Sequence, residues 1–177
     1  MAKAYTIRKS RCTHFFTMNK KSAILWLAVR LYVGWAWIEA GWGKLHNPAW
    51  VGGDAGAALT GFVRGAIAKT AGEHPAVQSW YASFLENVVL PHATLWSYMV
   101  ATGEFLIGVG LIFGVIVGVT AFFGAFMNWN FLMAGTVSVN PILIVLSFAL
   151  MLSWRVAGYL GIDYYVLPFL RKLTRRK

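Results

Sequence analysis

Glu104 is the residue whose type and position are most able to do chemistry in this chain. It is the only charged residue between Glu86 and Arg155, and it lies inside an apolar run from Ala93 to Met133. One helix needs roughly 20 apolar residues to cross a bilayer, so this longer run predicts two helices folded back on each other. A carboxyl group at such depth normally faces a partner or a substrate in the protein interior. Glu104 is therefore a candidate to give and take protons.

A second buried charge is predicted on the first apolar stretch. Counting along the predicted helices places Glu104 about 15 Å and Arg30 about 10 Å from the nearest membrane surface. An ion pair between Arg30 and Glu104 is then feasible. Such a pair either locks two helices together or acts on a substrate, and the sequence leaves both roles open. Glu39, nearer the opposite surface, is the third catalytic candidate.

Two asparagines and two tryptophans are candidates to bind a cofactor. Asn128 and Asn130 lie at mid-membrane depth, where an amide either binds a ligand or forms a hydrogen bond between helices. Asn128 shares a helix face with Gly124, whereas Asn130 points elsewhere. Trp35 and Trp42 have rings that stack on a quinone, although packing and interfacial anchoring explain them equally simply.

Lys44 and His46 follow the first apolar stretch and are the candidate substrate contacts. A cation at this position attracts an anionic substrate to the mouth of the bundle. His46, His74 and His92 show neither HxxH nor HxxxH spacing, so no metal site is predicted. Cys12 is the only cysteine, which excludes an internal disulfide.

The composition is that of an integral membrane protein. Of the 177 residues, 58% are hydrophobic and 12% charged, whereas a soluble domain carries about 25% charged residues. The net charge of +10 comes largely from clusters at the two ends of the chain, a distribution that follows the positive-inside rule. We expect contact with the lipid bilayer, no nucleic-acid partner, and a location in the plasma membrane of a prokaryote with both termini in the cytoplasm.

The elements that must position these residues are four predicted membrane spans. They cover about 23–43, 93–114, 116–135 and 141–161. We therefore predict an all-α membrane protein, a four-transmembrane-helix bundle with short amphipathic helices in the first outer loop. The transmembrane domain is 23–161, its outer loop is about 44–92, and basic cytoplasmic tails at 1–22 and 162–177 flank it.

Several short motifs in a fixed order resemble one family. The landmarks are Arg30–Trp35, Glu39–Leu45, Gly103–Gly108, Gly110–Gly114, Asn128, Ala134–Thr136 and Asn140-Pro141. With these residues the chain resembles the DoxX/DoxD family of small four-helix membrane proteins. It departs from the family at 114–118, where a turn that usually carries an arginine reads Gly-Val-Ile-Val-Gly.

The resemblance implies a function in sulfur oxidation. The DoxD branch includes the small subunit of thiosulfate:quinone oxidoreductase, which joins two thiosulfates into tetrathionate and passes the electrons to membrane quinone. On this basis we expect a membrane redox protein with quinone as electron acceptor, Glu104 as proton relay, and a second redox subunit or a second copy of the chain as partner. Two alternatives remain, namely a non-enzymatic anchor or assembly subunit of a redox complex, and a carrier of small anions.

Overall fold

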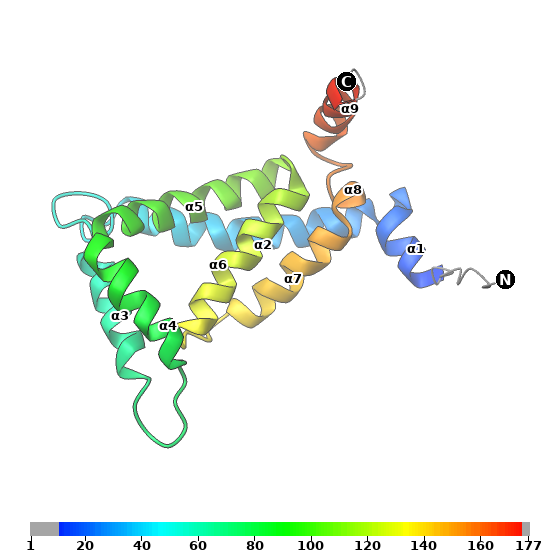
Figure 1. Ribbon diagram of the computed structural model, residues 1–177. Helices are drawn as coiled ribbons and strands as arrows, with labels where there is room; N and C mark the ends of the chain where they lie inside the picture. The colour runs from blue at the N-terminus through cyan, green and yellow to red at the C-terminus, as the bar shows by residue number, and fades with distance from the viewer. Residues whose placement is uncertain (1–10, 175–177) are drawn as a thin grey trace.

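Every regular element in the described part of the chain is a helix, which confirms the all-α prediction. The computed structural model describes residues 11–174, with side chains described over 14–169. The elements in chain order (Figure 1) are α1 (Arg11–Met18), η1 (Lys20–Ser22), α2 (Ala23–Leu45), α3 (Ala57–Ala68), α4 (Ser79–Phe84), η2 (Leu85–Val89), η3 (Leu90–His92), α5 (Ala93–Phe113), α6 (Val117–Met133), α7 (Asn140–Leu152), α8 (Trp154–Ala157) and α9 (Asp163–Thr174).

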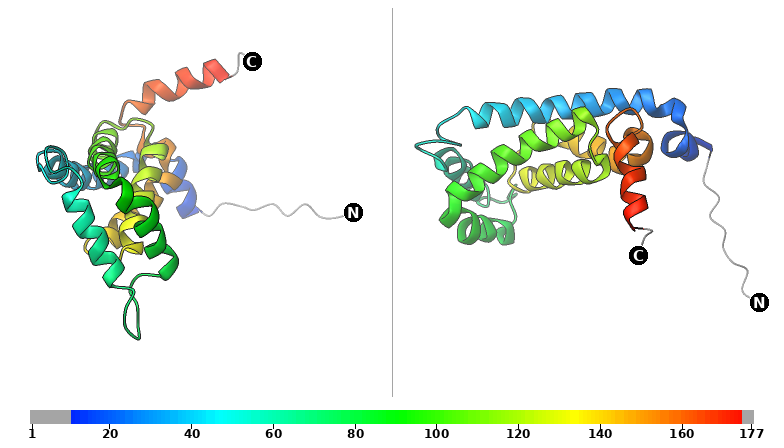
Figure 2. Two further views of the ribbon diagram at one scale, coloured as in Figure 1. Left: turned by 60° about the vertical axis from the view of Figure 1, so that its left-hand side comes forward. Right: turned by 90° about the horizontal axis from the view of Figure 1, so that it is seen from above.

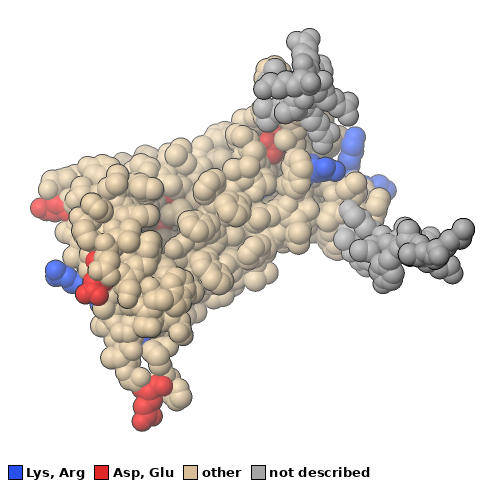
Figure 3. Space-filling model, in the orientation of Figure 1, with Lys and Arg blue, Asp and Glu red and all other residues tan. Residues whose placement is uncertain are grey.

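Two continuous helical stretches are long and apolar enough to cross a membrane. They are Lys20–Leu45 and Ser79–Phe113, with 26 and 35 residues. Shorter apolar helices cover Ala57–Ala68, Val117–Met133 and Asn140–Leu152. On the face seen in Figure 3, charged side chains gather at the two ends of the molecule, and the surface between them is almost wholly uncharged. This distribution is the one that a bilayer requires of a protein that it surrounds.

The helices α2, α5 and α6 lie where the first three spans were predicted, but the fourth predicted span is not one helix. α7 ends at Leu152, and the four-residue helix α8 follows after Ser153. This break turns the carbonyl groups of Ala157 and Leu160 toward Arg30 on α2, which donates hydrogen bonds to both. Of the predicted tails, 11–22 and 163–174 contain α1, η1 and α9, while 1–10 and 175–177 lie outside the described residues.

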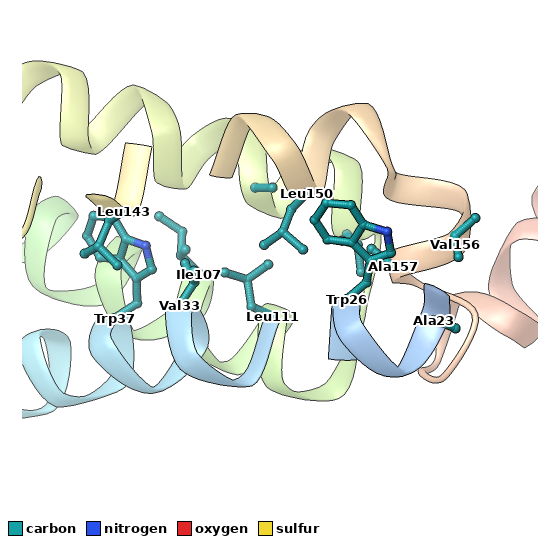
Figure 4. Close-up of a cluster of buried hydrophobic side chains, with 12 residues drawn as sticks. Ala23, Trp26, Val33, Trp37, Ile107, Leu111, Leu143, Leu150, Val156 and Ala157 are labelled. Carbon is teal, nitrogen blue, oxygen red and sulfur yellow. The ribbon is translucent and has the colours of Figure 1, made fainter. Parts of the chain in front are cut away.

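The bundle is built from two tightly packed helix pairs. α2 packs along α5, and α6 packs along α7, with α3 and α4 side by side at the end opposite α1 and α9 (Figures 1 and 2). The main core lies between the pairs, where Val33 and Trp37 of α2 and Leu111 of α5 meet Leu143 and Leu150 of α7 (Figure 4). A second core, around Val63 and neighbouring residues, joins α3 to α4 and η2.

The turn between α5 and α6 is held by a distant residue. Gly114 ends α5 with φ 69°, a left-handed conformation that glycine adopts readily. Ile116 has φ 45°, which is costly for a β-branched residue. Its N–H donates to Oδ1 of Asp163 at 2.5 Å, and the N–H of Val117 donates to Oδ2 at 2.8 Å. Asp163 therefore caps the first turn of α6 and stabilises the strained residue.

Glycines let the backbones of α2 and α5 touch. A Cβ atom added to Gly108 would lie 2.6 Å from the Ile38 nitrogen and 2.8 Å from the Gly34 carbonyl oxygen. One added to Gly41 would collide with the backbone of Phe105. Small residues at such a seam permit the close packing that holds membrane helices together. These contacts fix the register of α2 against α5.

Replacing Gly108 by alanine should therefore destabilise the fold. We expect Gly108→Ala to lower the free energy of unfolding by about 2 kcal/mol, the usual cost of overpacking. The matched control is Gly43→Ala on α2, because a Cβ added there meets no atom within 4 Å. Thermal unfolding in detergent micelles measures both. Equal melting temperatures for the two variants would contradict the close contact.

Candidate functional site

The predicted carboxylate is buried and pairs with a cation from α2. Lys44 Nζ lies 2.6 Å from Oε2 of Glu104. The Glu104 side chain is 1% exposed, whereas that of Lys44 is 21% exposed. The Lys44 ammonium also lies 5.2 Å from the ring centroid of Trp50. Lys44 is thus partly accessible from the protein surface, while Glu104 is almost completely inaccessible.

The α2–α5 register explains why Arg30 is not the partner of Glu104. Gly41 packs against Phe105, the neighbour of Glu104. Arg30 precedes Gly41 by eleven residues, about 16 Å along the helix axis. The hypothesised Arg30–Glu104 pair is therefore not formed, and Lys44 takes that place. Estimating depth by counting residues assumes that the midpoints of α2 and α5 lie at the same height in the membrane. The glycine contacts instead shift one helix along the other.

Arg30 is bound at the other end of α5. It is 1% exposed and lies against Gly114 and Gly161, with Nη1 3.0 Å from the carbonyl oxygen of Ala157 and Nη2 2.8 Å from that of Leu160. These contacts tie α2 to the chain that follows α7, so they favour the helix-locking role. Asp163 lies close enough to attract the guanidinium electrostatically.

Asp163 is a residue whose importance the sequence did not reveal. It is 1% exposed, and its two oxygens accept the N–H groups of Ile116 and Val117, as described above. Sequence reasoning treats a lone aspartate after an apolar stretch as an interfacial anchor. The only available signal was its position beyond a glycine-rich turn, at Gly158 and Gly161.

The two asparagines face different surroundings, as their spacing predicted. Asn128 is fully buried between helices. Asn130 accepts a hydrogen bond from the Tyr81 hydroxyl, 3.1 Å from its Oδ1, and donates from Nδ2 to the Phe126 carbonyl oxygen at 2.8 Å. An amide nitrogen carries two N–H groups, so the second remains available to another acceptor.

Asn130 also lines an apolar pocket in the wedge between α5 and α6. The pocket has a volume of about 510 Å³ and is walled by α3, α4, α5 and α6. Its lining is almost entirely apolar, and Tyr81, Thr120 and Asn130 are the polar residues that contribute to it. Several lining side chains are also exposed on the outer surface, among them Leu106, Phe123 and Phe126. The pocket therefore opens sideways toward the region that the apolar surface assigns to lipid.

The other candidates lie on an exposed face of α2 or directly after its end. Trp35 and Trp42 are 65% and 54% exposed. Glu39 and His46 are also exposed, and the His46 ring lies 4.1 Å from that of Trp42. Trp42 also packs against Phe105, the neighbour of Glu104, with ring centroids 5.9 Å apart. The polar partner that the structure gives to the Glu104 carboxylate is Lys44 and none of these four residues. Within the described residues, no group of three or more His, Cys, Asp or Glu is placed to hold a metal ion.

The Lys44–Glu104 pair should be coupled energetically. We expect Lys44→Met to lower the free energy of unfolding by about 3 kcal/mol, because it leaves a buried carboxylate without its partner. The double variant Lys44→Met/Glu104→Gln should recover most of that loss, since no buried charge remains. A double-mutant cycle with Glu104→Gln measures the coupling. Strictly additive effects would show that the two side chains do not interact.

Comparison with known proteins assigns the chain to a family. No curated protein and no solved structure matches the sequence. The family described as the TQO small subunit DoxD, where TQO is thiosulfate:quinone oxidoreductase, matches residues 25–177. This match covers the buried ion pair, the pocket and the capping aspartate, and it agrees with the resemblance seen in the motifs. The chain is a membrane protein that belongs to the DoxD family.

Proposed function

We propose that this chain is the membrane subunit of a redox enzyme that passes electrons from a small sulfur donor to quinone, as the family description suggests. The observation that carries the proposal is the placement of Glu104 on α5. One face of this helix buries the carboxylate against Lys44, and another face, including Gly103 and Leu106, walls the apolar pocket. A proton-binding group and a pocket for an apolar molecule therefore share one helix.

The pocket has the properties that a quinone requires. Its volume of about 510 Å³ lies within the usual range for small-molecule sites. Aromatic rings of Phe62, Phe84 and Phe123 offer apolar walls to a ring and a prenyl tail. The available N–H of Asn130, positioned by Tyr81, is a donor for a quinone oxygen. The sideways opening suits a molecule that arrives from the bilayer.

The residues have separate roles in the proposed reaction. Two thiosulfate ions, one quinone and two protons give tetrathionate and quinol, and the two electrons released as the S–S bond forms reduce the quinone. Lys44 attracts the dianionic donor to the end of the bundle. Glu104 holds a proton next to the pocket wall and gives it up for quinol formation. A second redox subunit completes the enzyme, since the family is described as that of a small subunit.

The proposed topology has four membrane crossings, made by α2, α5, α6 and the broken segment of α7 and α8. Both termini then lie in the cytoplasm of a prokaryote, and α3 and α4 lie on the outer side. Basic residues near both ends of the chain support this orientation. The Lys44–Glu104 pair is then close to the outer surface, where a donor that does not cross the membrane reaches it.

Neutralising Glu104 should slow turnover. With the protein purified together with any co-purifying subunit, thiosulfate-dependent quinone reduction by Glu104→Gln should fall by about 10²-fold, the usual contribution of a positioned acid or base. Its pH–rate profile should also lose one inflection, which a merely structural role would not remove. Glu86→Gln is the matched control, because Glu86 is an exposed carboxylate in the same continuous helical stretch, Ser79–Phe113.

Two results would contradict the redox proposal. One is the absence of quinone reduction, with thiosulfate or with sulfide, by folded protein that has its partner subunit bound. The other is full activity in Glu104→Gln with an unchanged pH profile, which would remove the proton role. Anion flux into proteoliposomes without redox chemistry would support the carrier alternative instead.

The orientation can be tested with thiol labelling. In intact spheroplasts, a membrane-impermeant maleimide should label His74→Cys, which lies between α3 and α4, when the native Cys12 is replaced by serine. The same reagent should label native Cys12 only after the cells are opened. The reverse pattern of labelling would invert the proposed topology.

A further inference from the structure

Three helices direct polar atoms into the centre of the bundle without a protein partner. Within the described part of the chain, Nε1 of Trp37, both amide atoms of Asn128 and Oγ of Ser147 are buried and have no hydrogen-bond partner. Trp37 is 2% exposed, and Asn128 and Ser147 are 0% exposed. Unpaired polar groups in an apolar interior are costly, and native proteins rarely keep them. The three side chains therefore require a hydrogen-bonding ligand.

Gly124 shows where such a ligand fits. A Cβ atom added to Gly124 would lie 3.3 Å from Trp37 Nε1, 3.5 Å from Ser147 Oγ and 3.4 Å from Cγ2 of Ile107. The indole N–H of Trp37 and the hydroxyl of Ser147 therefore converge beside Gly124, with no side chain from that residue between them. Asn128 follows Gly124 by one helical turn and projects from the same face of α6.

We propose that Trp37, Asn128 and Ser147 bind ordered water over Gly124, so that water bridges α2, α6 and α7. A water oxygen accepts from the indole N–H, and its hydrogens reach the hydroxyl and amide oxygens. The mixture of donors and acceptors carries no net charge, so it matches a neutral molecule rather than an ion.

The position of this site relative to Glu104 gives it significance. Ile107, which faces the site, follows Glu104 by three residues on the buried face of α5. Val33, Leu111 and Leu150 are 0% exposed and lie together between Trp37 and Ala157, the residue whose carbonyl binds Arg30 (Figure 4). Water at Gly124 therefore lies about one helical turn from Glu104 and is separated from Arg30 by apolar side chains. This inference does not depend on the redox function.

Substitution of Gly124 distinguishes a hydrated site from a dry one. If water occupies the site, Gly124→Ala displaces it and should lower the melting temperature by about 4 °C, the scale expected for a lost buried hydrogen bond in a chain of this size. Gly124→Ser should restore much of that loss, because its own hydroxyl reaches Trp37 and Ser147. In a dry site the Trp37 ring would have to move by only a few tenths of an ångström from a methyl carbon 3.3 Å from its Nε1. The higher helix propensity of alanine should offset that cost and leave the protein at least as stable as the wild type.

Gly65→Ala is the control, because a Cβ added to this glycine of α3 meets no atom within 4 Å. It should leave the melting temperature unchanged or raise it. A Gly124→Ala protein at least as stable as the wild type would overturn the proposal.

Water can also be detected directly. In ¹⁵N-labelled protein in micelles, the Trp37 indole signal, assigned by its loss in Trp37→Phe, should show cross-relaxation with water. The signal should persist in Ser147→Ala, which excludes relay through the hydroxyl, and should vanish in Gly124→Ala. A Trp37 N–H without water cross-relaxation in the wild type would overturn the proposal, whatever the redox assays give.

Discussion

The backbone contact between α2 and α5 is the constraint on which the rest of the structure depends. In a bilayer, apolar surface gives little drive for helices to associate, so close packing and hydrogen bonds hold them together. Gly34, Gly41 and Gly108 let the two backbones meet at one register. That register places Lys44 beside Glu104 and leaves Arg30 at the far end of α5. The chemistry of both charged residues follows from it.

The two buried charges are stabilised in different ways. Arg30 is surrounded by backbone carbonyl groups that a break after α7 makes available, and Asp163 links the same region to the start of α6. Every one of these partners belongs to the scaffold, so Arg30 is committed to structure. Glu104 instead has one flexible and partly exposed partner. In the proposed reaction the lysine side chain moves away when Glu104 takes up a proton, because the neutral carboxyl group no longer leaves an unpaired buried charge.

The sequence allowed the buried carboxylate to be found but not its surroundings. An isolated charge in an apolar run indicated the burial of Glu104, and helical spacing separated Asn128 from Asn130. Lys44 was missed as the partner of Glu104 because residue counting predicts which side chains meet only when the ends of two helices lie at the same height. The glycine contacts between α2 and α5 shift these helices along each other. The cap by Asp163 joins residues 47 positions apart, so no local pattern reveals it. Ser147 and Trp37 gave no signal, because both are ordinary residues of membrane helices.

The layer of Val33, Leu111 and Leu150 divides the interior into two polar compartments. Arg30 and Asp163 lie on one side, and Glu104 lies on the other with Trp37, Asn128 and Ser147. A proton crossing this layer would have to pass apolar side chains with 0% exposure. The direct route from Glu104 to solvent runs instead past Lys44, at the end that carries α3 and α4. In the proposed reaction, protons for quinol formation are therefore taken up at the end of the bundle where the sulfur donor binds, so electrons and protons enter from the same side.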